Sequence, residues 1–212
     1  MTLHIIYLAV VIRMALMRLL TLISFILLSN FWYGCQTNLR QLPTFSDNKQ
    51  LQVVVVTPAG SNHVQEYDEK QKEFKPALQA GLAQSINFLP LPGNLGFIPS
   101  TRSGNNDAPG KPLEILVLAE SKPAGTVQEV IPIATILLDM AGEMQDMVLA
   151  VPARPSERFL DATDLASFTH DFPAARQAVH QWFLHYLPNK QVRIAGWKDE
   201  KYTETLIRKQ LL

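Results

Sequence analysis

Cysteine is almost absent from this sequence, since Cys35 is the single cysteine among 212 residues. One cysteine cannot form an internal disulfide or a cysteine-rich zinc site. An excess of either charge is also missing, because 19 Lys and Arg residues balance 19 Asp and Glu residues. No long basic block occurs, so the sequence offers no positive field that would attract nucleic acid. We therefore expect no nucleic-acid partner.

The motifs of several large enzyme classes are missing as well. No G-x-S-x-G, P-loop or H-E-x-x-H pattern occurs, so serine-hydrolase, nucleotide-hydrolase and zinc-protease chemistry gain no support. His180 and His185 share a predicted helix, but a spacing of five residues puts them on different faces. Internal repeats are absent too. The length suits one domain with a sizeable core and a short N-terminal appendage.

What the sequence does have is a long hydrophobic run near its start, residues 3–28, which contains Arg13 and Arg18. A membrane span would bury an arginine near the bilayer centre, at a cost of about 2.5–3.5 kcal/mol each. An export signal that begins at Met14 or Met17 avoids this cost. Arg18 then forms the positive region and residues 19–28 form the apolar region of the signal.

The end of this run predicts how the chain is held at a membrane. Gly34-Cys35 resembles the cleavage junction of bacterial lipoproteins, which predicts lipidation of Cys35, although Trp32 and Tyr33 depart from that pattern. The alternative is an uncleaved N-terminal anchor. We predict an export or lipoprotein-like signal over residues 1–35, a tether over 36–50 and a domain over 51–212. The predicted location is the cell envelope, with the exported chain anchored to a membrane.

Strands are predicted in the first part of the mature chain and helices in the last third. Residues 51–57 form a β-branched run typical of a buried strand. Apolar residues recur at helical spacing from Ala175 to Tyr186, with Asp171 ahead as a capping candidate. Further strands are predicted over 113–119, 127–138, 147–151 and 191–195, a charged strand or hairpin over 66–75, loops over 87–99 and 100–112, and a final helix over 198–211. Pro132 implies a bulge or an edge position.

This order predicts an α+β fold that is mainly β, a small β-barrel with helices packed on one side. Several stretches of the domain then point to one family. Residues 94–101 read N-L-G-F-I-P-S-T, residues 112–118 read P-L-E-I-L-V-L, residues 150–152 read A-V-P and residues 182–186 read W-F-L-H-Y. Together with Gly196-Trp197 they resemble the family I (soluble-type) inorganic pyrophosphatases, and the similarity spans residues 51–212.

The resemblance implies a five-stranded, OB-like closed barrel, the inorganic pyrophosphatase fold, with an acidic pocket. It also implies hydrolysis of diphosphate to two phosphates by magnesium ions and an attacking water. Magnesium requires hard oxygen ligands, and the highly charged substrate requires lysine and arginine. The expected ligand is therefore diphosphate or another phosphorylated small molecule, and bacterial relatives that form hexamers make a homo-oligomer possible.

Three positions keep the residue type that the resemblance implies. Glu114 matches a metal-binding aspartate, Asp139 matches a catalytic and metal-binding aspartate, and Tyr186 matches a catalytic tyrosine that binds phosphate. Each also has a structural alternative. Glu114 suits the polar face of a strand, Asp139 suits a turn, and Tyr186 suits a helix face in the core.

Most of the other family positions are replaced. Lys111 stands where the family has a metal-binding aspartate, so a ligand becomes a cation that repels magnesium. Another metal aspartate aligns with Met144 or Gln145, a phosphate-binding lysine with Val64 or Gln65, and an arginine with Ala83 or Gln84. The replaced positions are Val56, Val64, Leu95, Pro109, Lys111, Met147 and Leu187.

Two functions follow from these replacements. The chain is either a diphosphatase-family enzyme with weak or no activity, or a non-catalytic envelope lipoprotein that uses the scaffold to bind a ligand or partner. Loss of one magnesium ligand already costs orders of magnitude in such catalysis. Asp107, Glu143 and Asp146 are the carboxylates that could replace lost ligands if their loops turned inward. An OB-like nucleic-acid module is disfavoured by the neutral charge.

Overall fold

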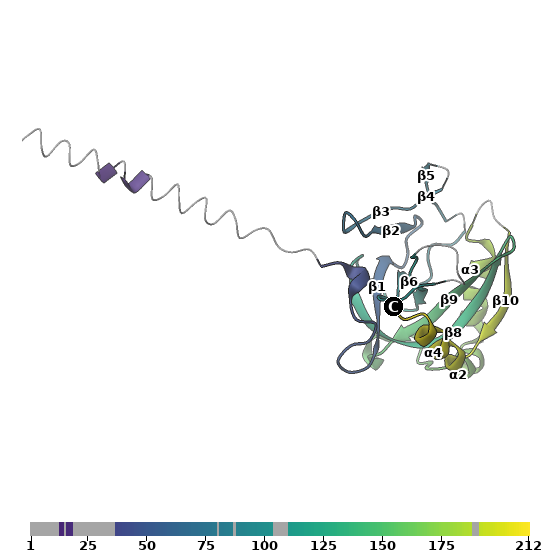
Figure 1. The fold of residues 1–212 in the computed structure, drawn as a ribbon. Coiled ribbons are helices and arrows are strands. Elements are labelled where there is room, and N and C mark those ends of the chain that lie inside the picture. The colour runs from purple at the N-terminus through teal and green to yellow at the C-terminus, as the bar shows by residue number, and fades with distance from the viewer. Residues whose placement is uncertain are drawn as a thin grey trace, which may run out of the picture. The chain divides into compact units, whose positions relative to one another are not determined.

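The structure is a computed structural model that describes residues 13–14, 16–18, 37–79, 81–86, 88–103, 110–187 and 191–212 (Figure 1). The chain divides into two compact units, Met1–Thr37 and Asn38–Leu212. The predicted apolar region of the signal, the Gly34-Cys35 junction and Pro109 lie outside the described residues. Within those residues, none of the helices has the length and apolar character needed to span a bilayer.

Five strands of the second unit form a ring, which confirms the predicted α+β fold with a dominant sheet. Around the ring the strands are β1 (Leu51–Thr57), β6 (Asn94–Phe97), β7 (Glu114–Val117), β9 (Glu143–Pro152) and β8 (Val127–Met140). The ring closes because β1 also pairs with β8. β7 and β9 are parallel, and the other pairs are antiparallel.

The long strand β8 pairs with two different strands along one edge. Its first residues, 127–130, pair with β1, whereas residues 135–140 pair with β10 (Val192–Lys198). The register against β9 shifts between Pro132 and Ala134. Proline has no backbone N–H to donate, so a bulge is the position in which a sheet tolerates it. The predicted irregularity at Pro132 is therefore confirmed.

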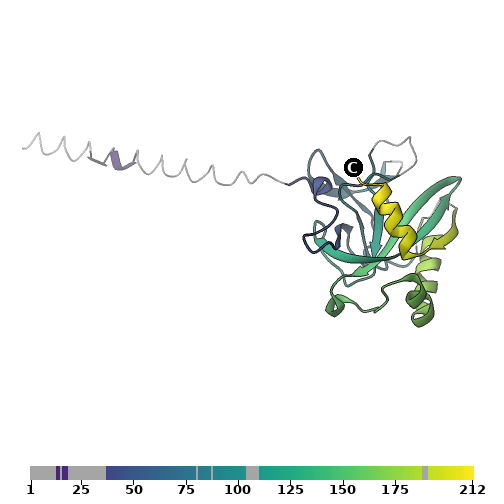
Figure 2. The same ribbon diagram turned by 60° about the horizontal axis from the view of Figure 1, so that its bottom comes forward.

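Successive residues of the ring point to opposite faces, and each face has its own core. Ile115, Val117 and Val148 lie in a cluster with Leu206 and Ile207 of α4 (Glu200–Lys209). Figure 2 shows α4 in yellow across the strands. Because side chains alternate along a strand, the intervening residues form a second core on the other face.

The second core, here called the α3-side cluster, joins ring residues such as Leu116 and Leu149 to helix α3 (Pro173–His185) through Trp182 and Phe183. Helix α2 (Leu165–Asp171) precedes α3 and contributes Phe168, and the short 3-10 helix η3 spans Pro155–Glu157. The prediction that Asp171 caps the long helix is wrong. Asp171 ends α2, and Asp164 caps α2 by accepting a hydrogen bond from the Ser167 N–H at 2.7 Å.

The predicted loop over residues 87–99 is also wrong in part, because β6 forms within it. Gly96 explains this strand, since a Cβ there would collide with the carbonyl oxygen of Val54 on β1. The absence of a side chain lets the two backbones pair. Sequence patterns of four residues between prolines do not reveal such a strand, because they are too short to show a period.

Two small hairpins extend from the ring. β2 (Gln65–Asp68) pairs with β3 (Glu73–Pro76), which confirms the predicted charged hairpin, and β4 (Leu78–Gln79) pairs with β5 (Leu82–Ala83). The start of the second unit lies against the first hairpin at the 3-10 helix η2 (Leu39–Gln41).

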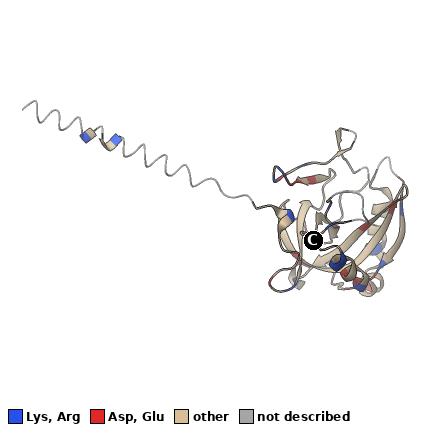
Figure 3. Cartoon of the chain, in the orientation of Figure 1, with Lys and Arg blue, Asp and Glu red and all other residues tan. Residues whose placement is uncertain are grey.

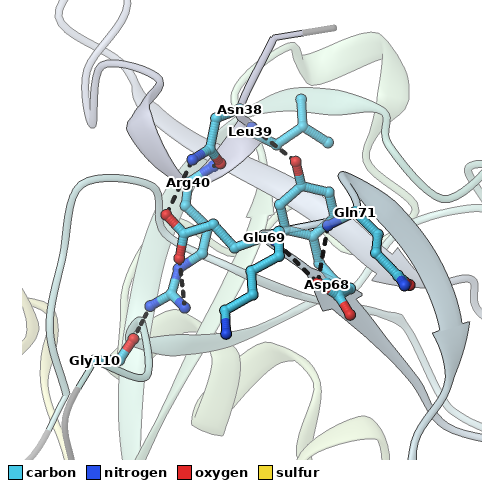
Figure 4. Close-up of polar contacts among 9 residues, drawn as sticks. Asn38, Leu39, Arg40, Asp68, Glu69, Gln71 and Gly110 are labelled. Carbon is cyan, nitrogen blue, oxygen red and sulfur yellow. Dashed lines mark hydrogen bonds and ion pairs between the residues drawn. The ribbon is translucent and has the colours of Figure 1, made fainter.

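Figure 4 shows the contacts of this N-terminal segment. The Asn38 side-chain amide donates to Glu69 at 2.9 Å, and the Leu39 N–H donates to the Tyr67 hydroxyl at 3.2 Å. Arg40 forms an ion pair with Glu69 at 3.5 Å and donates to the carbonyl of Gly110. Within the predicted tether, residues from Asn38 onward are therefore bound to the domain.

Candidate active site

Glu114 is the first residue of β7 and lies in a row of apolar side chains. Its cross-strand partners are Phe97 on β6 and Met147 on β9, both buried. Paired residues of adjacent strands point to the same face of a sheet. The half-buried Glu114 carboxylate therefore lies between a phenyl ring and a thioether.

Gln145 is the direct partner of Glu114. Its side-chain amide nitrogen, Nε2, donates to Glu114 Oε2 at 2.7 Å. The sequence left open whether Met144 or Gln145 takes the place of a family aspartate. Gln145 faces Glu114, whereas Met144 is 60% exposed, so Gln145 is the one of the two whose side chain lies beside Glu114. Two positions that the resemblance assigns to metal ligands are thus hydrogen-bonded to each other.

Burial raises the pKa of the Glu114 carboxyl, while the positive charge of Lys111 and the hydrogen bond from Gln145 act in the opposite direction. The net pKa remains above the ordinary value of a glutamate. Lys111 is exposed in the segment just before β7, and its carbonyl accepts a hydrogen bond from the Ser103 N–H at 2.8 Å. A cation therefore acts on Glu114 from a position where the family has a carboxylate.

Tyr186 lies just beyond the end of α3 and faces the same region. Its ring stacks on Trp182 with the centroids 4.7 Å apart, and its hydroxyl donates to the Met140 sulfur at 3.7 Å. Burial raises the pKa of the Tyr186 phenol, and the negative charge of Glu114 raises it further. The structure therefore brings Tyr186 within electrostatic range of Glu114.

Asp139 is placed differently, near the turn between β8 and β9. Its Oδ1 accepts from the Gly142 N–H at 2.8 Å, and its Oδ2 accepts from Arg193 on β10. The bond from Gly142 and then the bond from Arg193 hold the Asp139 pKa below its ordinary value. The structure thus ties Asp139 to a turn and an ion pair rather than to Glu114.

Several of the replaced family positions lie in the hydrophobic core. Met147 is buried in the α3-side cluster, and Val64, Leu95, Tyr186 and Leu187 pack against that cluster. Val56 is buried next to Val54 and Phe97. Sequence reasoning identified these replacements one by one but missed that four of them, Val64, Leu95, Met147 and Leu187, belong to or pack against one cluster. Their common apolar character was the available signal.

The other predicted carboxylates do not supply a second ligand to Glu114. Asp146 points to the opposite face from Gln145. Burial raises the pKa of Tyr202 on α4, and the charge of Asp146 raises it further. Burial raises the pKa of Asp146 itself. Glu143 is exposed at the start of β9, and Asp107 lies outside the described residues.

The residues around Glu114 do not fit a magnesium centre. Magnesium prefers six oxygen ligands in near-ideal octahedral geometry. Here the Glu114 carboxylate accepts a hydrogen bond from the NH₂ group of Gln145, which cannot bind a cation, and it feels the positive charge of Lys111. Across the described part of the chain, no three His, Cys, Asp or Glu residues are grouped so that they could hold a metal.

Comparisons with known proteins agree with the resemblance. The family model described as inorganic pyrophosphatase matches residues 53–211. An inorganic pyrophosphatase of Saccharolobus solfataricus is 34% identical over 169 residues, which cover 76% of this chain and 90% of the relative. One from Mesorhizobium japonicum is 29% identical over 164 residues, covering 75% and 86%.

Solved structures show the same similarity. The crystal structure of inorganic pyrophosphatase from Thermus thermophilus superimposes with a TM-score of 0.67 and 26% identity, and the match covers 81% of this chain and 95% of that one. An inorganic pyrophosphatase from Neisseria gonorrhoeae gives a TM-score of 0.65 at 24% identity, with 82% and 95% covered.

Proposed function

Because this chain belongs to the inorganic pyrophosphatase family, we propose that it keeps the family's fold but hydrolyses diphosphate weakly or not at all. The observation that carries this proposal is the pairing of Gln145 with Glu114 at 2.7 Å, next to the charge of Lys111. At these three positions the resemblance implies aspartates that bind metal.

Charge explains why the replacements matter. A magnesium ion at Glu114 would have to displace the Gln145 amide and approach the Lys111 ammonium, which has the same sign of charge. An amide NH₂ donates hydrogen bonds, so it offers nothing to a cation. The family's Mg²⁺ requirement is therefore not met by the described residues.

The positions that the resemblance assigns to substrate binding are also unsuited to their ligand. Diphosphate carries several negative charges, which need lysine, arginine or backbone N–H groups as partners. Val64, Met147 and Leu187 provide hydrocarbon where the family has lysines. Hydrocarbon cannot replace the water that solvates a phosphate oxygen, so transfer of the substrate into this site is unfavourable.

The second part of the proposal concerns where the chain is located and what it binds. The apolar run over residues 3–28 and the Gly34-Cys35 pair support an exported chain that is held at a membrane of the cell envelope. We infer that the domain binds a partner or a small ligand there, including a phosphorylated one, and we leave open assembly as a homo-oligomer.

Phosphate release from magnesium diphosphate by the full-length chain tests the loss of catalysis. We expect release at the rate of the protein-free reaction or only slightly above it. Two variants make the test specific: Glu114→Gln removes the carboxylate of the site, and Asp146→Asn removes one that points to the other face. Release by the unchanged chain far above the protein-free rate, abolished by Glu114→Gln and preserved by Asp146→Asn, would show an active enzyme and refute the proposal.

Thermal unfolding with millimolar magnesium provides a second test. The unchanged chain should unfold at the same temperature with and without the ion. A Lys111→Asp, Gln145→Asp double variant restores two carboxylates, so magnesium should raise its unfolding temperature, because an ion that binds only the folded state stabilises it. A magnesium-dependent rise in the unchanged chain would contradict our account of these two residues.

A further inference from the structure

The β4–β5 hairpin exposes leucine on both of its faces. Leu78 pairs with Ala83, and Gln79 pairs with Leu82. Because adjacent residues of a strand point to opposite faces, Leu78 and Leu82 lie on opposite sides of this two-stranded ribbon. Their exposed fractions are 65% and 75%. Water therefore covers apolar side chains above and below the hairpin.

The hairpin belongs to an unusually uncharged part of the chain. Residues 76–101 contain no Asp, Glu, Lys, Arg or His. Two more large apolar residues of this stretch, Phe88 and Leu89, are 44% and 62% exposed. Figure 3 shows the β4–β5 hairpin in tan, whereas the neighbouring β2–β3 hairpin carries charged residues. Exposed apolar surface without charges is typical of sites that contact a membrane or another protein.

The tip of the hairpin is open. Gly81 has a φ of +81°, a left-handed conformation, and a Cβ there would meet none of the described atoms within 4 Å. A flat protein surface could cover only one face of such a ribbon. A lipid layer, in contrast, can surround both faces.

We propose that the β4–β5 hairpin inserts Leu78 and Leu82 into the surface of a lipid bilayer, as a second membrane contact besides the N-terminus. The apolar run over residues 3–28, which predicts that the chain is held at a membrane, would supply the nearby lipid. Insertion stays shallow, because the outer backbone groups of a two-stranded ribbon need water as a hydrogen-bond partner. The inference rests on the proposed membrane location but not on the loss of catalysis.

A fluorescent reporter on the full-length chain tests this contact. In a Cys35→Ser background, Leu82→Cys is labelled with an environment-sensitive NBD dye and mixed with phosphatidylcholine vesicles that contain a doxyl-labelled lipid. We expect a blue shift and strong quenching of the dye. Asp161→Cys is the matched control, because the Asp161 side chain is also highly exposed, at 81%, but is charged. The dye at position 161 should be neither shifted nor quenched.

The results of this experiment show whether lipid or a second copy of the chain covers the β4–β5 hairpin. Quenching at position 82 alone, lost when Leu78→Asp is added, supports the proposal. Unquenched dye at position 82 on vesicle-bound protein overturns it, and so does equal quenching at both positions. The Cys35→Ser chain keeps the apolar run over residues 3–28, so its failure to bind vesicles would overturn the proposed membrane location and the hairpin contact together. A blue shift without lipid that grows with protein concentration would assign the hairpin to a second copy and would also overturn it. Phosphate release is measured separately, so either proposal can fail alone.

Discussion

Single residues decide what the Glu114 region can bind. Glu114 survives as a carboxylate, but Gln145, Lys111 and Met147 each changed so that the carboxylate is satisfied from within the chain or surrounded by hydrocarbon. The sequence predicted the retained glutamate and the replaced lysine correctly as residue types. It could not predict the hydrogen bond to Gln145, because a one-residue gap left two alignments and only the register of β9 chooses between them.

The raised pKa of Glu114 makes a prediction about pH. A group whose pKa is higher in the folded protein adds stability at pH values below its unfolded pKa, and this stability is lost as the pH rises through the folded pKa. Glu114→Gln keeps an acceptor for Gln145 without the buried charge. We expect this variant to unfold at a higher temperature than the unchanged chain at pH 7.5, by roughly 2–4 °C.

The difference in unfolding temperature should shrink as the pH is lowered toward the ordinary glutamate pKa of 4.5, because the carboxyl becomes protonated in the folded state first and in the unfolded state below that value. Calorimetry of both proteins between pH 4.5 and 8 measures it. Tyr186→Phe is the control, because its phenol does not titrate in this range and its substitution should shift all pH values alike. A gap that widens at low pH would mean that Glu114 is stabilised, not destabilised, by its surroundings.

Hydrophobic patterns predicted the strands and helices whose formation does not depend on tertiary contacts. The run over residues 51–57 became β1 with the same bounds, and the periodic segment after Ala175 became α3. β9 begins at Glu143 rather than at Met147, because its polar first residues are held by pairing with β8. β6 depends on the close approach that Gly96 allows, and the local sequence carries no sign of it.

Helix capping provides a matched pair of substitutions. Asp164→Ala removes the side chain that accepts from the Ser167 N–H at the start of α2, and should cost about 1 kcal/mol of unfolding free energy. Asp171→Ala removes an aspartate that the sequence suggested as a cap but that ends α2. A negative charge there opposes the dipole of α2 but favours that of α3, which begins two residues later, so its loss should be close to neutral.

Urea unfolding of the two variants measures this difference at neutral pH. The pKa of Asp164 is held below its ordinary value by its bonds to Ser167, so the benefit of the cap is present above that value and fades as the pH falls. Equal losses in both variants would show that burial near α2, rather than capping, determines the effect.

The whole molecule combines the fold of the inorganic pyrophosphatase family with a site that we propose has lost its metal ligands. The order of strands and helices, together with the sequence blocks, was enough to predict the ring and the family. The chemistry was predictable only as a set of missing ligands, because the sequence does not show that Val64, Leu95 and Leu187 all pack against the α3-side cluster.

Contacts of the N-terminal segment locate the start of the folded domain. Leu39 and Leu42 pack against the cluster of Val54, Val56 and Phe97, and the buried Thr44 hydroxyl donates to the Pro99 carbonyl at 2.9 Å. Deletion of residues 1–37 removes none of these groups, so its unfolding temperature should equal that of the full chain. Deletion of residues 1–45 exposes one side of β1 and should lower that temperature by several degrees, because each of the two partly buried leucines contributes about 1 kcal/mol, less than a fully buried one. Thermal unfolding of both truncated proteins, followed by circular dichroism, measures the difference. Equal unfolding temperatures for the two would show that the segment is a tether along its whole length and that the domain begins at β1.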